Sequence, residues 1–305
     1  MRFALDPGAL VALRRLMRER GVALVHTHSS VDSWIGGLAA RSLGRPVVRS
    51  RHVSIPILRR RALVYRLADR IITTGEGIAR IVAAAGVDPA KIVSVPAGVD
   101  TTRFHPGVSG KAVRDELGLP SAPAGHVVGL VANIRGSKGH RYFLEAARAV
   151  LRALPDTRFL VVGDGVGFDD VRRRAHELEL DEHVIMTGFR RDIPEVMAAL
   201  DLLVLPSTRS EATSQVIPQA LAVGTPVAAT AVGGIPEIVR DGENGRLVPP
   251  ADPAALAAAI VELLRDRERA RALAQAGQRE VLARYTVEAM MARTQAVYRE
   301  LLGGA

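Results

Sequence analysis

The chain has 305 residues, of which 48% are hydrophobic and 24% are charged. This is an ordinary globular composition, sufficient for one large or two medium domains. The absence of cysteine excludes disulfide bonds, thiolate nucleophiles and thiolate metal sites. The longest mildly apolar stretch, residues 220–236, is broken by glycine and proline, so we predict no membrane-spanning helix.

Positive charge is unevenly distributed along the chain. The net charge is +9, but residues 1–107 carry +10 and the remainder carries −1. The densest stretch, Arg41 to Arg70, holds nine arginines and a single acid, Asp69. Such a stretch attracts nucleic acid, anionic lipid or a phosphorylated substrate, although a solvated surface explains it equally well. We disfavour nucleic acid, because aromatic residues are only 4% and no helix-turn-helix, RNP or zinc pattern is present.

In chain order, the sequence opens on an amphipathic helix over residues 7–20 rather than on a strand. Short β-branched runs then alternate with longer amphipathic runs, which predicts an α/β protein with parallel sheets. The first part is expected to contain strands at residues 22–26, 46–50, 70–73 and 92–95. The second part is expected to contain strands at residues 126–131, 158–162, 184–187, 202–205 and 226–229.

A domain boundary is indicated near residues 99–108, where glycine and proline cluster. We therefore expect an N-terminal domain at 1–107, a second domain at 108–285, and a C-terminal helix at 286–305 that packs back toward the first. A doubly wound domain normally opens on a strand, so we expect the N-terminal domain to be incomplete at its front.

The loop after the strand at 126–131 combines two cations, Arg135 and Lys138, with Gly136 and Gly139. A loop between a strand and a helix N-terminus is a natural anion site, and this one suits a diphosphate. It lacks the P-loop pattern, and a solvated loop with incidental charges is the alternative. A second loop, Gly163-Asp164-Gly165, follows the next strand and is weak evidence alone.

The segment after the strand at 202–205 gives the strongest signal. Glu211 falls in the loop before a helix, and Gln219 lies one to two turns inside that helix. Backbone amides at the helix start, near residues 213–216, suit a phosphate, while Glu211 suits hydroxyl groups or simply caps the helix. A further glycine pair, Gly233-Gly234, follows the next strand, and residues 241–245 indicate a tight turn.

The order of these motifs resembles the family 4 glycosyltransferases, retaining enzymes of the GT-B fold, over nearly the whole chain. The resemblance implies two Rossmann-like parallel-sheet domains, of which the N-terminal one lacks its front, about 60–70 residues. It rests on the following segments: Lys138-Gly139, Gly163-Asp164-Gly165, Gly188-Phe189, Leu205-Pro206-Ser207, Glu211 to Gln219, Gly233 to Glu237, and Pro96 to Asp100 with Phe104.

The resemblance implies a nucleotide-sugar donor held between the domains, with no metal and no cofactor. The implied catalytic residues are Arg135, Lys138, Glu211 and His52, the cations stabilising the departing diphosphate. The implied donor-binding residues are Asn133, Gly136, Gly163, Gly165, Gly188, Phe189, Arg190, Thr213, Ser214, Gln215 and Gln219. His28 is implied on the acceptor side, although either histidine could instead be a packed or surface imidazole.

This sequence departs from the family pattern at two positions in the donor site. The family places a second glutamate where Gln219 stands, so we expect a weaker or altered nucleotide preference. The family's loop arginine falls at Asn133, and we expect Arg135 to supply that cation.

The function expected from these features is sugar transfer to a cell-envelope lipid or polysaccharide acceptor. The protein would be cytoplasmic, either free or peripheral on the inner membrane face, where it would dock through Arg41–Arg70. A donor-binding protein with impaired catalysis is the alternative, because the N-terminal domain is expected to be incomplete. A dehydrogenase is disfavoured, because no GxGxxG opens a βαβ unit.

Overall fold

A computed structural model describes residues 6–58, 62–121, 123–209 and 211–303. The chain divides into a first unit, Met1–Gly98 with Glu288–Ala305, and a second unit, Val99–Val287. The first boundary lies before the predicted one at Gly107, because the connecting segment packs with the second unit. The Val99 amide donates to the carbonyl of Tyr285 at 2.7 Å, and Phe104 is buried in the second unit's core.

The first unit is built on a four-stranded parallel sheet in the order β1-β2-β3-β4. The strands are β1 (Val25–Thr27), β2 (Val47–Arg51), β3 (Arg70–Thr73) and β4 (Ile92–Ser94). The helices are α1 (Pro7–Glu19), α2 (Ser30–Arg41), η1 (Leu63–Leu67), α4 (Glu76–Ala84), η2 (Pro89–Lys91) and α13 (Val287–Leu302). A capping box between Ser29 and Asp32 fixes the start of α2 directly after β1.

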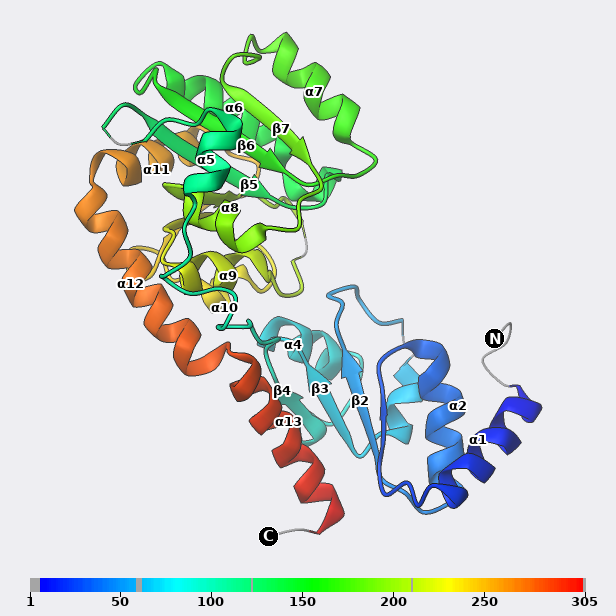
Figure 1. Cartoon of the computed structure of the whole chain (residues 1–305). Helices are drawn as coiled ribbons and strands as arrows, with labels where there is room; N and C mark the ends of the chain where they lie inside the picture. The colour runs from blue at the N-terminus through cyan, green and yellow to red at the C-terminus, as the bar shows by residue number, and fades with distance from the viewer. Residues whose placement is uncertain (1–5, 59–61, 122, 210, 304–305) are drawn as a thin grey trace. The chain divides into compact units, whose positions relative to one another are not determined.

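Helix α13 lies against the sheet of the first unit (Figure 1). Its Val297 packs with Val48, Ile72 and Val95 from three neighbouring segments of that unit. Glu300 forms an ion pair with Arg70 at the start of β3. The C-terminal helix α13 therefore contributes to the hydrophobic core of the first unit.

The second unit is built on a six-stranded parallel sheet in the order β10-β9-β8-β5-β6-β7. The strands are β5 (His126–Val131), β6 (Thr157–Val162), β7 (Val184–Gly188), β8 (Leu202–Leu205), β9 (Val227–Thr230) and β10 (Arg246–Val248). The helices are α5 (Lys111–Leu117), η3 (Gly136–Lys138), α6 (His140–Leu151), α7 (Phe168–Glu177), α8 (Ile193–Ala199), α9 (Val216–Val223), α10 (Ile235–Ile238), α11 (Pro253–Arg265) and α12 (Arg267–Arg284).

Both faces of this sheet are buried, as its continuous apolar strands predict. On one face Val128, Leu130 and Phe159 pack beneath helices α6, α7 and α11. On the other face Val127 and Val131 pack with residues of α8, α9 and α10 (Figure 1). Among the described helices, none has both the length and the apolar character that crossing a bilayer requires.

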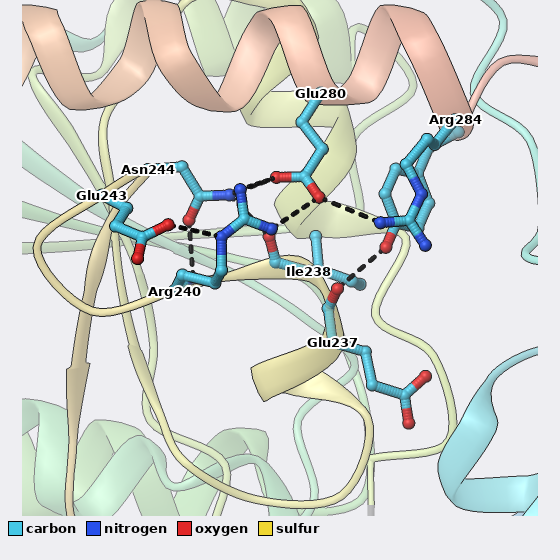
Figure 2. A network of polar contacts seen from close by, with 8 residues as sticks. Glu237, Ile238, Arg240, Glu243, Asn244, Glu280 and Arg284 are labelled. Carbon is cyan, nitrogen blue, oxygen red and sulfur yellow. Dashed lines mark hydrogen bonds and ion pairs between the residues drawn. The ribbon is translucent and has the colours of Figure 1, made fainter.

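A polar network fastens α12 to the turn between α10 and β10 (Figure 2). Arg240 pairs with Glu280 of α12 at 2.8 Å and with Glu243 at 2.7 Å. Asn244, only 1% exposed, donates to the Ile238 carbonyl and to Glu280, and accepts from the Arg240 amide. Every polar atom of the Asn244 side-chain amide therefore has a hydrogen-bond partner. These hydrogen bonds, in addition to turn propensity, explain the Asp241–Gly245 turn.

We expect the Asn244→Asp substitution to lower the free energy of unfolding by about 2–4 kcal/mol at neutral pH. A carboxylate cannot donate to the Ile238 carbonyl, and it would face the carboxylate of Glu280. The loss should shrink as the pH falls, because a protonated carboxyl group can donate. Urea unfolding followed by far-UV circular dichroism measures this effect.

Glu243→Gln, at an exposed position of the same network, is the control and should change stability by less than about 0.5 kcal/mol. Equal losses in both variants would refute this account.

Candidate functional site

The second unit has a topological switch point between β5 and β8. These strands are neighbours, but the chain continues from β5 to β6 on one side and from β8 to β9 on the other. In open parallel sheets, ligands bind in the crevice outside the carboxyl ends of the strands at such a point. The loops that follow β5 and β8 are the two in which the sequence placed Lys138 and Glu211.

The loops at this edge approach one another more closely than residues with side chains would allow. A Cβ atom on Gly139, which has φ +74°, would lie 1.8 Å from the carbonyl oxygen of Pro206. A Cβ atom on Gly163, which has φ +139°, would lie 1.9 Å from the carbonyl oxygen of Ala132. These glycines are thus required for contact between loops, whatever they do toward a ligand.

Lys138 and Glu211 join the loops after β5 and β8. The Lys138 ammonium donates to both carboxylate oxygens of Glu211, at 3.0 Å to Oε2 and more closely to Oε1. The two side chains are only 17% and 8% exposed. Ser207 adds a hydrogen bond to Glu211 at 3.3 Å, and the Gly234 amide donates to the Glu211 carbonyl at 2.8 Å. Two predicted catalytic residues are therefore in direct contact.

A cavity of about 780 Å³ lies over the ends of β5, β6 and β7. Five of the residues predicted to bind a donor line it: Asn133, Gly163, Gly165, Phe189 and Arg190. Phe189 and Val166 are 72% and 98% exposed at the same cavity, an unusual exposure for apolar side chains. The cavity thus has the exposed ring of Phe189 on one side, and the backbone of Gly163 and Gly165 also lines it.

Arg190 is committed to protein carboxylates. Its guanidinium binds both oxygens of Glu116 at 2.7 and 2.8 Å and also contacts Asp192. Hydrogen bonds from these two acids, Glu116 first, raise the pKa of Arg190 above its ordinary value. Its side chain therefore forms a neutralised wall of the cavity rather than an available cation.

The predicted phosphate-binding segment lies at the start of α9. Gln215 is the N-cap residue, Thr213 and Ser214 precede it, and Ser214 is 5% exposed. Pro218 carries no amide hydrogen, so the first-turn donors of this helix are Val216 and Ile217. Gln219 is half-buried in the same helix, where the family pattern has its second acid.

The two remaining loop residues, Arg135 and Gly136, line a different cavity, between α6 and α7. Arg135 is exposed and its guanidinium contacts no partner within the described part of the chain. Gly188 ends β7 with φ +71° and accepts a hydrogen bond from the Gly163 amide at 2.9 Å. The structure thus separates Arg135 from the Asn133 cavity, and its role toward a diphosphate stays a prediction.

In the first unit, His28 and His52 meet at the ends of β1 and β2. His28 Nδ1 lies 3.2 Å from His52 Nε2, and the rings are stacked with centroids 5.5 Å apart. His26 adds a third ring, bonded to Tyr298 Oη at 2.6 Å and Ser50 Oγ at 2.8 Å. His26 belongs to the sequence pattern His26-Thr27-His28. Its contact with Tyr298 arises only in the folded chain.

Burial favours the neutral form of His26 and of His52. Desolvation first, and then the neighbouring rings of His28 and His52, lower the pKa of His26 to about 4, with Asp32 opposing the effect. Desolvation followed by His28 lowers the pKa of His52. The described residues contain no group of three His, Asp or Glu side chains placed to hold a metal ion.

We expect the first unit to lose stability as the pH falls from about 6.5 toward 4. The pKa of His26 is lower in the folded state than in the unfolded state, so acid favours the unfolded chain in this window. The fluorescence of Trp34, the only tryptophan, reports unfolding of this unit selectively. In urea titrations, His26→Gln should show a shallower loss of stability with falling pH than the unsubstituted protein. Parallel pH profiles would contradict the assignment.

Comparison with known proteins agrees with this geometry. The family described as Glycosyltransferase Family 4 matches residues 1–103, and the family described as Glycosyl transferases group 1 matches residues 125–266. A D-inositol 3-phosphate glycosyltransferase of Segniliparus rotundus is 34% identical, over 92% of this chain and 67% of that protein. A UDP-Gal:alpha-D-GlcNAc-diphosphoundecaprenol alpha-1,3-galactosyltransferase of Escherichia coli is 28% identical, over 86% and 71%.

Solved structures share the fold. Anabaena Alr3699/HepE, crystallised in complex with UDP, superposes with a TM-score of 0.85 at 24% identity, covering 96% of this chain and 81% of that one. A glycosyltransferase from Rickettsia africae ESF-5 superposes with a TM-score of 0.92 at 20% identity, covering 100% and 84%. Together with two parallel-sheet α/β units and the Lys138–Glu211 contact at the switch point, these matches show that the chain belongs to glycosyltransferase family 4 and has the GT-B fold.

Proposed function

We propose that this protein is a metal-independent, retaining glycosyltransferase. It transfers a hexose or related sugar from a nucleotide-sugar donor to a cell-envelope lipid or polysaccharide acceptor. The observation that carries the proposal is the buried contact of Lys138 with Glu211, which places a cation and a carboxylate together at the switch point.

The donor site in this proposal combines the Asn133 cavity with the start of α9. Phe189 offers a face for the nucleotide base, since aromatic rings stack on bases, and Arg190 borders it. The backbone of Gly163 and Gly165 forms the floor. Amides near Ser214 and Gln215 bind phosphate oxygens at the positive end of α9, and Gln219 binds ribose. Uridine diphosphate is the first donor class to test, because a structural neighbour was crystallised with UDP.

Lys138 and Glu211 have complementary roles in the transfer. When the bond between the sugar and the diphosphate breaks, negative charge develops on the departing phosphate. The Lys138 ammonium stabilises that charge from a position that Glu211 fixes before the reaction. The Arg135 guanidinium is the second cation proposed for this role. Glu211 accepts hydrogen bonds from donor-sugar hydroxyls and holds Lys138 in place before the donor arrives. Because the pair is largely buried, each side chain is costly to leave unpaired.

The first unit supplies the acceptor side in this proposal. His28 binds the acceptor and His52 acts near the reacting sugar, both through hydrogen bonds of their imidazole rings. The named substrate of the Escherichia coli relative is a diphosphoundecaprenol, which motivates a lipid-linked acceptor here. The arginines between Arg41 and Arg70 would attract the anionic inner face of a membrane.

We expect Lys138→Ala to weaken UDP binding by at least about ten-fold, because a charged hydrogen bond to phosphate is lost. Isothermal calorimetry with UDP, GDP and ADP measures this, and it also identifies the preferred nucleotide. Lys111→Ala, an exposed lysine of the same unit paired with Asp115, is the matched control and should bind normally. The double variant Lys138→Ala/Glu211→Gln avoids an unpaired buried carboxylate and should bind as weakly as the single one. Failure of every nucleotide to bind a folded protein would overturn the donor site.

The Arg135→Ala substitution tests whether Arg135 is the second cation of the donor site, beside Lys138. If Arg135 stabilises the diphosphate, the ratio kcat/KM for sugar transfer or donor hydrolysis should fall by about ten-fold or more. An unchanged rate would remove Arg135 from the donor site. Nucleotide binding without turnover in the unsubstituted chain would instead favour a donor-binding protein with impaired catalysis.

A further inference from the structure

Three histidine rings gather on one face of the first unit's sheet. His26 lies in β1, and side chains two residues apart on a strand point to the same face, so His28 follows it there. Ser50 lies in β2 on that face, and His52 comes directly after β2. Helix α13 covers the same face and brings Tyr298 to His26. The rings therefore meet at the carboxyl ends of two adjacent parallel strands, the edge at which such sheets bind ligands.

His26 is anchored at both of its ring nitrogens. Its Nδ1 lies 2.6 Å from Tyr298 Oη, and its Nε2 lies 2.8 Å from Oγ of Ser50, a residue that is 5% exposed. A ring bound at both nitrogens is held in one orientation and has no nitrogen left for a ligand. Any contribution of His26 to the reaction therefore passes through the residues that it contacts.

His28 is the ring that His26 contacts directly. The centroids of the two rings are 4.2 Å apart, with 34° between their planes. The backbone amide of His28 donates to Asp32 Oδ2 at 2.8 Å, at the start of α2. The main chain and the ring of His28 are thus each held by residues of the first unit.

The hydrogen bond between His28 and His52 links the protonation patterns of the two rings. His28 Nδ1 lies 3.2 Å from His52 Nε2, so one of these nitrogens donates and the other accepts. A neutral imidazole carries a single N–H group. If His28 donates, both rings carry their hydrogen on Nδ1; if His52 donates, both carry it on Nε2.

The same rule decides what the pair offers outward. In either arrangement, one of the two outer nitrogens, His28 Nε2 and His52 Nδ1, is a donor and the other is an acceptor. Both histidines are exposed residues, and within the described ranges neither outer nitrogen has a hydrogen-bond partner. A hydroxyl group donates one hydrogen bond and accepts others, so it matches such a pair.

We propose that His26, anchored by Tyr298 and Ser50, is a positioning residue for the His28–His52 pair, and that this pair binds the reacting hydroxyl group of the acceptor. The inference rests on the proposed sugar transfer. It adds to that function the group of the acceptor that is recognised, and a residue of the C-terminal helix that supports its recognition.

NMR spectra that correlate ring protons with ring nitrogens, recorded on the whole protein with labelled histidine, test the pair. At about pH 8, above the ordinary pKa of imidazole, His28 and His52 should have the same tautomer. His28→Gln and His52→Gln assign the signals. Opposite tautomers in the unsubstituted protein would overturn the inference.

The double variant Tyr298→Phe/Ser50→Ala tests the positioning role, because it keeps the His26 ring and removes both of its anchors. The rings of His28 and His52 should then become mixtures of tautomers, and kcat for hydrolysis of UDP-glucose, with water as the hydroxyl probe, should fall by about ten-fold. The KM for UDP-glucose and the affinity for UDP should not change, because the proposed donor site belongs to the second unit. Far-UV circular dichroism checks the fold.

Tyr142→Phe, which removes a tyrosine hydroxyl group from α6, is the matched control and should leave the spectra and kcat unchanged. Unchanged tautomers and kcat in the double variant would remove His26 from the acceptor side. If the unsubstituted protein neither binds UDP nor hydrolyses UDP-glucose, the proposed function fails, whereas the tautomers of His28 and His52 still decide the inference.

Discussion

The contact between Lys138 and Glu211 is the constraint on which the second unit's site depends. It joins the loops of two strands that are adjacent in the sheet but far apart in sequence. A partly buried ammonium and carboxylate tolerate separation poorly, so the two loops are held at one distance. The positions of these two charged side chains are therefore fixed before any ligand arrives, which is the condition for electrostatic catalysis.

Backbone packing around the pair reinforces this arrangement. Gly139 lets its loop reach the carbonyl of Pro206, and the Thr208 amide donates to the Ser137 carbonyl at 2.9 Å. Ile134, 1% exposed, anchors the same loop in the core. The Ile134 amide bonds to the carbonyl of Asp164, which ties in the loop after β6 as well. The three loops after β5, β6 and β8 are therefore joined to one another by backbone contacts above the apolar core of the sheet.

The loop from Ala132 to Gly139 separates two cavities of different character. Asn133 faces the cavity with exposed Phe189 and Val166, whereas Arg135 faces the cavity with buried His140. Asn133 and Arg135, two residues apart in one short loop, thus line two different spaces.

The sequence by itself determined the parallel α/β class, most strands and the loops that carry polar side chains, because apolar strands and glycine-rich turns are local signals. It indicated Lys138, Glu211 and Phe189 as members of a site. It missed the short strand Arg246–Val248 and placed the domain boundary at Gly107, because the pairing of Val99 with Tyr285 spans most of the second unit. Only the tertiary structure decided that Arg135 lines another cavity, that Arg190 is neutralised by Glu116, and that Tyr298 meets His26. These contacts depend on side-chain direction and long-range packing, which residue spacing does not encode.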